Sequence, residues 1–410
     1  MQAMQDGRSR RSSLCSLGRR KKMSKVAEVF YLANELLASI FKHLNGFELC
    51  TVARTCRRFR DASHIEEIWQ HLCDRDYGAS SLRQWPEGTT YRDLYINVLH
   101  KYGYLLGLWK CDVNPYGGLV YIEIVQGGID AFDCRAPLDP DITSVLRRRR
   151  IFSIRIEEGK SVVLCYSSWD DTPHYATLHK EKIDGKKVVR FYLQCSNQER
   201  HEFPREREKG MQFLRRWMKD EYDNENLLFY QPHMIQLVLM KYVNMHSMHR
   251  MPIDFEALEL PQQTDEELVI KPGIFKGTYS SHGVELVMVT FSSAEDKILG
   301  IKITGDPNVP EGKLTFEVDL RRPVIEELPV SEGQQRPFEL PNVIEARFTD
   351  FPPFYQAKYH GAGQIASHGF LSPRMTPGVF VLFNDDLFGF LWSDLMAFSV
   401  YSRANEPYLR

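Results

Sequence analysis

The sequence has little of what marks a membrane protein, a nucleic-acid-binding protein or a secreted protein. Its 410 residues carry a formal net charge of -2, which gives no overall attraction to nucleic acid or to a membrane surface. No apolar run approaches the roughly 20 residues of a membrane-spanning helix. Its eight cysteines are irregularly spaced and no signal peptide is present, which favours a reducing compartment. We therefore expect a cytoplasmic or nuclear protein that binds neither nucleic acid nor a membrane.

The motifs of common enzyme classes are also missing. The sequence contains no Gly-x-Ser-x-Gly elbow, no full Gly-x-x-x-x-Gly-Lys-Ser phosphate-binding loop and no His-Glu-x-x-His motif. Cys165 and His174 offer a nucleophile and a base, but a metal site uses the same atoms better. We therefore expect a chain that has no catalytic residues of its own.

What is present is an ordinary globular composition, with 43% hydrophobic and 26% charged residues. A chain of this length suits two or three domains rather than one core. Residues 1–27 are basic and polar and contain RSRRSS and GRRKKMSK, which predicts a disordered tail. The sequence leaves open whether this tail is only solvated or carries a nuclear signal or a kinase site.

Apolar residues recur at helical spacing between Leu32 and Trp69. Asn45-Gly46 interrupts the pattern, and Asn34 can cap its start. We expect two or three helices of about a dozen residues each, which is too little chain to bury both apolar stripes. One face is therefore left for a partner, unless the segment is an ordinary helical hairpin with a leucine-rich core.

This segment resembles an F-box, because it contains the motifs LxxELLxxIFxxL and VxxxCxxFR followed by a tryptophan. An F-box docks on the Skp adaptor of cullin-RING ubiquitin ligases. Ala33 departs from the family, which usually has Pro at this position; the change loosens the helix start and leaves the adaptor surface in place. The resemblance implies an adaptor-binding surface made of Leu36, Leu37, Ile40, Phe41, Leu44, Leu49, Val52, Phe59 and Trp69.

Strand signals follow a helical bridge over residues 70–106. From Leu108 the sequence alternates β-branched and aromatic residues between Gly and Pro breaks, and the pattern resumes at Gly273. Residues 206–250 interrupt it with amphipathic helical spacing. Short strands at regular spacing predict β-barrels.

Two smaller features stand out in the strand-rich part. The run Arg147–Arg150 predicts a solvated loop before a strand at Ile151, with an anion site as the alternative. The word Ser-His-Gly occurs at residues 281–283 and again at 367–369, either as a weak internal repeat or in two similar strands of one barrel.

A wider similarity, to the F-box only protein 31 family, runs from about residue 30 to about residue 403. It rests on the stretches GLWKCDVNPYGGL, IKPGIFKGTYSSHGVE, KITGDPNVP and SHGFLSPRMTPGVFVLFNDDLFGF. The resemblance implies an α+β fold in which a helical F-box domain precedes two β-barrel motifs with intervening helices. The expected parts are the F-box and bridge at 28–106, the first barrel part at 107–205, helices at 206–250 and the second barrel at 251–410. A long polar insertion that family members carry before the last strands is short here.

Four potential metal ligands lie in the first barrel segment: Cys165, His174, Cys195 and His201. Two thiolates and two imidazoles give zinc a closed tetrahedral shell, which suits a structural site. His179 is a competing ligand, and two buried cysteines with two surface histidines are the alternative. The family resemblance implies a Cys2His2 zinc site in this segment, so we expect zinc to staple the first barrel.

The candidate substrate site is the second barrel, which the resemblance implies receives the C-terminal tails of substrates. The expected contacts are Lys276, Thr278, Tyr279, His282, Lys302, Thr304 and Asp306. Strand alternation places Lys302 and Thr304 on one face. A lysine favours a carboxylate end, whereas Asp306 accepts hydrogen bonds from a carboxamide. Alternatively, Asp306 belongs to an ordinary Gly-Asp-Pro-Asn turn, and His282 and His368 are turn or core histidines.

These features together predict a non-catalytic substrate-recognition subunit of an Skp–cullin–F-box ubiquitin ligase. Its expected partners are the Skp adaptor, through it the cullin and RING subunits, and protein substrates. The resemblance implies D-type cyclins or C-terminally amidated proteins as substrate classes. The alternative is a small-molecule-binding or hydrolytic β-barrel that is tethered to the adaptor.

Overall fold

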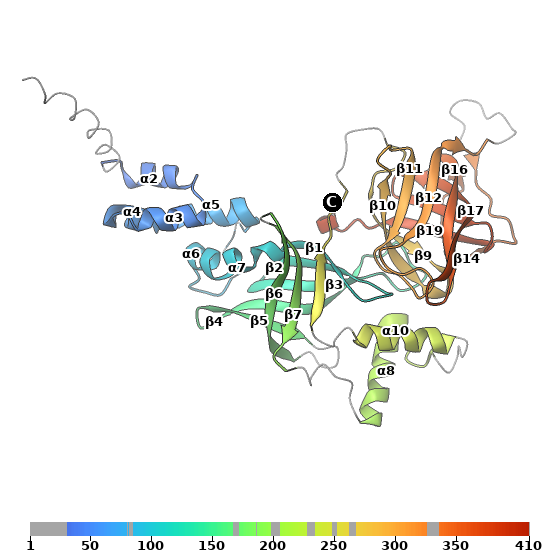
Figure 1. Cartoon of the computed structure of the whole chain (residues 1–410), viewed down its shortest axis with the longest axis horizontal. Coiled ribbons are helices and arrows are strands. Elements are labelled where there is room, and N and C mark those ends of the chain that lie inside the picture. The colour runs from blue at the N-terminus through green and yellow to red at the C-terminus, as the bar shows by residue number, and fades with distance from the viewer. Residues whose placement is uncertain are drawn as a thin grey trace, which may run out of the picture. The chain divides into compact units, whose positions relative to one another are not determined.

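The chain divides into two compact units, Met1–Gly103 and Tyr104–Arg410. The computed structural model describes residues 31–79, 81, 85–166, 172–185, 187–197, 206–227, 234–247, 252–261, 268–325 and 336–409. The first unit is helical and the second consists mainly of strands, which confirms the predicted α+β fold (Figure 1). Within these ranges, no helix is both long and apolar enough to cross a membrane.

Four helices form the F-box segment of the first unit: α2 (Asn34–Phe41), α3 (Gly46–Ala53), α4 (Arg57–Ser63) and α5 (Glu66–Tyr77). The break at Asn45 is a capping box, in which Asn45 and Glu48 exchange side-chain-to-backbone hydrogen bonds of 2.9 Å. The predicted cap at Asn34 is wrong. Asn34 is the first helical residue, and Ala33 occupies the N-cap position without a side-chain hydrogen bond.

The predicted helical bridge packs against these helices. It comprises α6 (Tyr91–Leu94), the π-helical turn η2 (Tyr95–Leu99), α7 (His100–Tyr102) and η3 (Gly103–Leu105). The Tyr95 ring lies 5.4 Å from the Trp69 ring. A Cβ at Gly46 would stand 2.5 Å from Tyr95, so the glycine lets α3 approach the bridge.

The first barrel closes through a strand that the sequence assigned to the second barrel. It consists of β1 (Gly107–Cys111), β2 (Leu119–Val125), β3 (Gly128–Arg135), β4 (Arg147–Glu157), β5 (Lys160–Tyr166), β6 (Pro173–Asp184), β7 (Lys187–Cys195) and β8 (Ile253–Ala257). Strand β8 pairs with both β1 and β7. Its Phe255 is fully buried and stacks on Phe191 with ring centres 4.7 Å apart. The predicted boundary at residue 251 is therefore wrong, because this strand completes the earlier barrel.

The four-arginine run is not a solvated loop. Arg147–Arg150 forms the start of β4. The Arg150 Nε lies 2.9 Å from Asp130, and Arg148 contacts Glu123. Carboxylates on β2 and β3 thus neutralise arginines that the sequence alone could only place beside Ile151.

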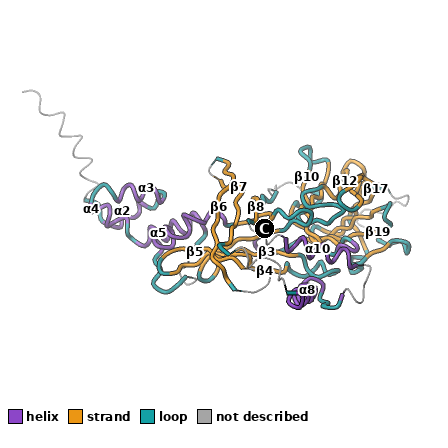
Figure 2. Tube along the Cα trace, turned by 60° about the horizontal axis from the view of Figure 1, so that its bottom comes forward, coloured by secondary structure: helices purple, strands orange, loops and turns teal. Residues whose placement is uncertain are grey.

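Two helices interrupt the strands as predicted: α8 (Arg207–Tyr222) and α10 (Ile235–Ser247) (Figure 2). Trp217 and Tyr242 pack with their ring centres 5.1 Å apart. The Lys241 Nζ lies 2.7 Å from Glu221, which is itself close to Arg135 and Arg147. An apolar contact and an ionic network thus join the helices to each other and to the first barrel.

The second barrel closes through pairing of its last strand with its first. Its wall consists of β9 (Gly273–Thr278), β10 (Val284–Phe291), β11 (Lys297–Lys302), β12 (Leu314–Pro323), β16 (Ala357–Ser367), β17 (Leu371–Asn384), β18 (Leu387–Trp392) and β19 (Ala397–Arg403). Short pieces accompany it: η6 (Ser280–His282), β13 (Arg336–Pro337), β14 (Glu345–Ala346), β15 (Phe354–Tyr355) and η7 (Pro407–Leu409). Strand β19 pairs with β9 at one end and with β14 at the other.

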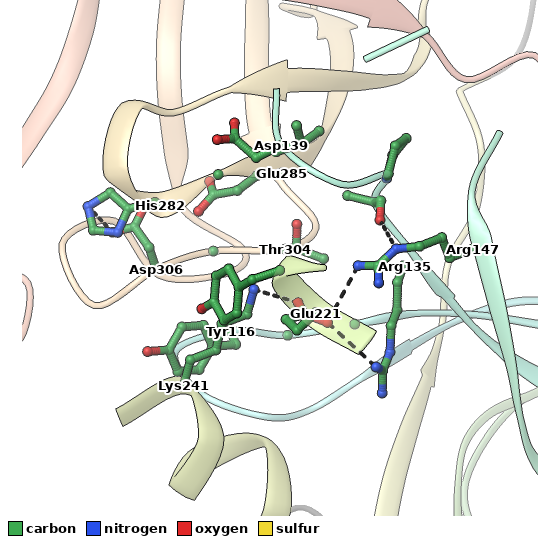
Figure 3. Close-up of a pocket in the computed structure, with 18 of the residues that line it drawn as sticks. Tyr116, Arg135, Asp139, Arg147, Glu221, Lys241, His282, Glu285, Thr304 and Asp306 are labelled. Carbon is green, nitrogen blue, oxygen red and sulfur yellow. Dashed lines mark hydrogen bonds and ion pairs between the residues drawn. The ribbon is translucent and has the colours of Figure 1, made fainter. Parts of the chain in front are cut away.

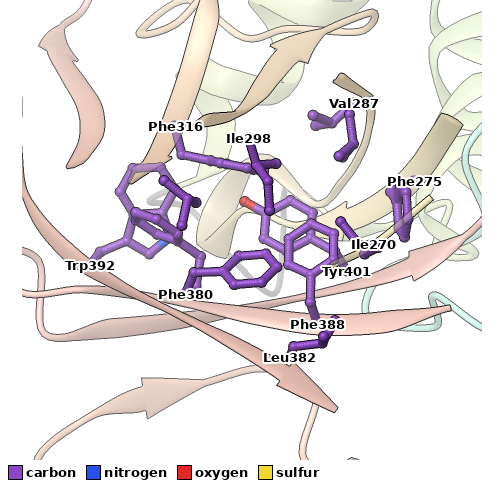
Figure 4. Packing of buried hydrophobic residues seen from close by; sticks show 13 residues of the cluster. Ile270, Phe275, Val287, Ile298, Phe316, Phe380, Leu382, Phe388, Trp392 and Tyr401 are labelled. Carbon is purple, nitrogen blue, oxygen red and sulfur yellow. The ribbon is translucent and has the colours of Figure 1, made fainter. Parts of the chain in front are cut away.

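Aromatic rings fill the second barrel (Figure 4). Phe275, Phe388 and Tyr401 are fully buried, and the Phe388 and Tyr401 rings stack 4.6 Å apart. Alternation turns Ile274 of the same strand outward, where it packs with Leu119 of the first barrel. The inner face of β9 and β10 thus supports the barrel core, and the outer face joins the two barrels.

Candidate functional site

A cavity of about 250 Å³ opens at one end of the second barrel. The ends of β9, β11, β16 and β18 and the beginning of β19 form its wall. The structure brings five of the predicted substrate residues to this cavity: Thr278, Tyr279, His282, Lys302 and Asp306. The aromatic core closes the cavity from below, where Trp392 forms part of the lining.

Two predicted substrate residues lie elsewhere. Lys276 faces outward with Ile274, and its Nζ donates a 2.7 Å hydrogen bond to the Ser144 carbonyl. Thr304 lines a second, smaller cavity of about 100 Å³, and its Oγ1 accepts a 2.7 Å hydrogen bond from the Leu286 amide (Figure 3). The expected alternation of Lys302 and Thr304 fails because β11 ends at Lys302 and the chain leaves the sheet there.

A buried charge cluster separates the two cavities. Lys302 is 2% exposed, and its Nζ lies 2.6 Å from Glu285 Oε2 and in contact with Asp306 Oδ2. The same nitrogen stands 4.2 Å from the ring centre of Tyr279. Sequence reasoning missed Glu285. Its signal was register, because Glu285 lies two residues before Val287, which pairs with Lys302 and shares its face.

Asp306 combines the two interpretations that the sequence left open. Its Oδ1 accepts hydrogen bonds of 2.6 Å from the Asn308 amide and 2.9 Å from the Val309 amide. This geometry is the turn predicted from Gly-Asp-Pro-Asn. Its other oxygen binds Lys302 at the cavity wall, so the turn also orients the carboxylate.

The pKa values of the three charged groups in this cluster shift in different directions. Burial opposes the charged form of Asp306, but Lys302, His282 and the Val309 amide together lower the pKa of Asp306 to about 2. Burial also opposes the ammonium of Lys302, yet the two carboxyl groups raise its pKa. Burial raises the pKa of Glu285 well above its usual range despite Lys302. The cluster therefore favours the ammonium of Lys302 and the carboxylate of Asp306, and it disfavours the charged form of Glu285.

Most polar groups around the cavity are already engaged within the protein. Tyr279 Oη and Thr315 Oγ1 are 3.0 Å apart, and Trp392 Nε1 donates a 3.0 Å hydrogen bond to Ser399. Gln364 differs. Its Oε1 is buried and has no hydrogen-bond partner among the residues the structure describes. The cavity therefore presents a buried acceptor that a ligand can satisfy.

Arg347 is the second cation at the cavity, and it too is paired. It donates a 2.5 Å hydrogen bond to the Ser280 carbonyl and lies 2.7 Å from Asp139. The Arg347 side chain is 39% exposed, so it belongs to the rim rather than to the interior.

The two Ser-His-Gly motifs both lie next to the loop that carries Asp306. The Asn308 side chain donates a 2.9 Å hydrogen bond to the Ala366 carbonyl, and the Gly369 amide donates a 2.8 Å hydrogen bond to the Pro307 carbonyl. On the other side, His282 Nε2 stands 3.8 Å from Asp306 Oδ1. Both Ser-His-Gly motifs therefore support the loop that carries Asp306.

Three of the predicted zinc ligands share one face of the first barrel. Cys165 on β5 pairs with His174 on β6, and Cys195 on β7 pairs with Ala176, two residues from His174. His201 lies outside the described residues. Within the described part of the chain, no group of three or more His, Cys, Asp or Glu residues has metal-binding geometry. The zinc site therefore stays a prediction.

The predicted adaptor surface divides into core and exposed residues. Leu36 and Ile40 are 53% and 48% exposed. By contrast, the structure buries four of the predicted contacts inside the helical unit: Leu37, Phe41, Leu49 and Trp69. Leu44, Val52 and Phe59 are partly buried. Phe47, which the sequence analysis did not select, is 79% exposed. Helical spacing identified the apolar stripe but not which of its members face solvent.

Known proteins match both parts of this chain. An F-box-like family model matches residues 34–75, and a model described as Cyclin D1 binding domain matches residues 255–407. F-box only protein 31 of Mus musculus is 32% identical, and the match covers 92% of this chain and 85% of the mouse protein. The Rattus norvegicus protein is 33% identical with the same coverage, and the Homo sapiens protein is 30% identical over 92% of this chain and 83% of its own length.

The chain belongs to the F-box only protein 31 family. The F-box match coincides with α2 to α5, so these helices are an F-box, which implies binding to the Skp adaptor. A strand-rich unit follows it, and this arrangement is that of an F-box substrate receptor. The family match also places the 250 Å³ cavity inside the segment that carries the second domain model.

Proposed function

We propose that this chain is the non-catalytic substrate-recognition subunit of an Skp–cullin–F-box ubiquitin ligase and that its second barrel captures the C-terminal tails of substrates. The cavity at the barrel end is the observation that carries this proposal. The matched Cyclin D1 binding domain spans the same barrel, which supports a protein ligand and makes D-type cyclins candidate substrates. The transfer of ubiquitin takes place on other subunits of the ligase.

The size and position of the cavity favour a chain end over an internal segment. A volume of about 250 Å³ holds roughly two side chains, and the aromatic core blocks the way through the barrel. An internal segment would have to enter and leave through the same mouth. A C-terminal tail needs only one passage.

The polar groups favour a carboxamide end over a carboxylate end. The ammonium of Lys302 already forms ion pairs with Glu285 and Asp306 and lies over the Tyr279 ring. A carboxylate therefore meets no unpaired cation inside the cavity. A carboxamide instead donates to Gln364 Oε1, which otherwise carries the cost of about 1–3 kcal/mol of an unsatisfied buried acceptor.

Peptide binding to the purified complex with its adaptor tests this proposal. One sequence is presented as a free acid, as an amide, and with its end blocked by further residues. We expect the amide to bind about tenfold more tightly than the acid, because about 1–3 kcal/mol for one satisfied acceptor spans that factor. We expect the blocked peptide to bind least. Equal affinity for all three forms contradicts capture of chain ends.

The geometry does not favour the hydrolytic alternative. A hydrolase of the Ser-His-Asp type needs the acid to orient the base through a hydrogen bond. His282 Nε2 lies 3.8 Å from Asp306 Oδ1, which is longer than a hydrogen bond, and Asp306 is committed to two backbone amides and to Lys302.

Zinc remains part of the proposal for the first barrel. The strand register supports this proposal because it places Cys165, His174 and Cys195 on one face of adjacent strands. His201 is proposed as the fourth ligand. Such an ion would supply no chemistry to the substrate and would hold β5, β6 and β7 together.

A further inference from the structure

Glu285 sits behind the substrate cavity rather than in it. It lines the smaller cavity (Figure 3), and Asp306 borders both cavities. Lys302 lines the larger cavity. Glu285 is 4% exposed and lies on the inner face of β10. It reaches the larger cavity through the ammonium of Lys302 and through Asp306.

Charge balance does not require this second carboxyl group. Asp306 already forms an ion pair with Lys302 and is further held by two backbone amides. Burying another carboxyl group costs free energy that its attraction to the ammonium repays only in part. The position of Glu285 is therefore better explained by what it does to Lys302 than by stability.

The contacts of the Lys302 ammonium show how Glu285 acts on it. Its nitrogen contacts three groups, and Glu285 Oε2, 2.6 Å from Nζ, forms an ion pair with it on the side away from the larger cavity. If that partner were absent, one donor would be released beside a cavity in which a ligand end lies. A released ammonium N–H binds a carboxylate strongly because both groups are charged.

We propose that Glu285 is a positioning residue that sets the chain-end preference of the receptor, by holding the Lys302 ammonium away from the ligand. This inference rests on the proposed capture of chain ends. It assigns the rejection of a carboxylate end to a residue that never touches the ligand.

The test measures the affinity of the purified complex for matched acid and amide peptides. In the Glu285→Met variant, Lys302 loses one acceptor, and we expect the affinity for the acid to rise about tenfold while the affinity for the amide stays within about threefold. Glu285→Gln keeps an acceptor for Lys302, so we expect it to restore the wild-type ratio. The double variant Glu285→Met/Lys302→Met lacks the ammonium, and we expect no gain in acid affinity.

A matched control comes from the exposed ion pair on the same sheet. Glu317 lies 3.3 Å from Lys297, and both side chains are 34% exposed. Glu317→Met removes a carboxylate from a lysine at the start of β11; neither residue lines the cavity, and we expect the change to leave both affinities unchanged.

The outcomes separate this inference from the proposed function. An equal loss of both affinities in Glu285→Met, an unchanged ratio, or a gain that persists without Lys302 would overturn the role of Glu285 while chain-end capture stands. A Glu285→Gln variant that behaves like Glu285→Met would also overturn it, because occupancy of the N–H would not be the cause. Wild-type complex that binds acid, amide and blocked peptides equally would overturn both.

Discussion

At the scale of single residues, the cavity depends on acidic and amide groups more than on its lysine. Lys302 is enclosed by Glu285, Asp306 and Tyr279, so it acts as part of the wall. Among the described residues that line the cavity, Gln364 has a buried polar atom, Oε1, that remains for a ligand. Recognition in this account is therefore the acceptance of hydrogen bonds from a neutral end, and not the pairing of opposite charges.

A substitution of Gln364 separates binding from stability. Gln364→Met removes an unsatisfied buried acceptor, so we expect the free energy of unfolding to stay equal or to rise by about 1 kcal/mol. The same change removes a partner for the ligand, and we expect the affinity for an amide peptide to fall about tenfold while the affinity for the acid changes little. Chemical denaturation and peptide binding measure the two effects.

Gln356 offers the control for this substitution. Its side chain is exposed. Its backbone amide donates a 2.7 Å hydrogen bond to the Leu382 carbonyl, which a methionine retains. Gln356→Met should leave both quantities unchanged. A Gln364→Met variant that lowers the affinities for acid and amide equally would refute the assigned role.

Which residues line the cavity was only partly predictable from the sequence. Strand and turn signals placed Thr278, Tyr279 and Asp306 correctly near one another. Lys276 was misplaced because the sequence does not show which face of β9 points inward; Phe275 takes the inner face and leaves Lys276 outside. Glu285 escaped attention because a single glutamate in an apolar strand gives no signal until its register with Lys302 is known.

At the scale of elements, local patterns identified the helices and strands better than their partners. The F-box helices follow directly from the apolar spacing and from the capping box at Asn45. The place of β8 could not be read from its sequence, because closing the first barrel after an excursion through α8 and α10 is a long-range pairing. The same limit applies to the arginine run in β4, whose carboxylate partners lie on other strands.

The zinc proposal concerns the join between β5, β6 and β7. We expect purified protein to contain one equivalent of zinc, and we expect removal by a chelator to lower the thermal stability of the strand-rich unit, since structural zinc contributes directly to folding. Cys195→Ser should lose the metal, whereas Cys134→Ser, at a buried cysteine on β3, should retain it. Metal-free protein whose melting temperature a chelator does not change would rule out the site.

At the scale of the whole molecule, the chain combines two tasks in two units. The helical unit presents Leu36, Ile40 and Phe47 to solvent, which is unusual for large apolar side chains and indicates a partner. The strand-rich unit contains the cavity. Family resemblance predicted this division from motifs in the sequence, whereas the pairing that closes each barrel and the charge cluster between the cavities required the structure.

A reconstituted ubiquitination assay tests whether the helical unit binds the ligase while the strand-rich unit recognises a chain end. Two fluorescent peptides with one acceptor lysine differ only in ending as a carboxamide or a carboxylate. Each is incubated with the complete ligase that contains either the wild-type chain or the Leu36→Asp/Ile40→Asp variant. These two side chains are exposed, so the variant should fold and should still bind the amide peptide.

We expect the wild-type ligase to modify the carboxamide peptide about tenfold faster than the carboxylate peptide when both are below saturation. We expect the Leu36→Asp/Ile40→Asp variant to bind the carboxamide peptide normally but to modify neither peptide. Equal modification of both peptides by the wild-type ligase, or undiminished modification by the variant, would refute the proposed function.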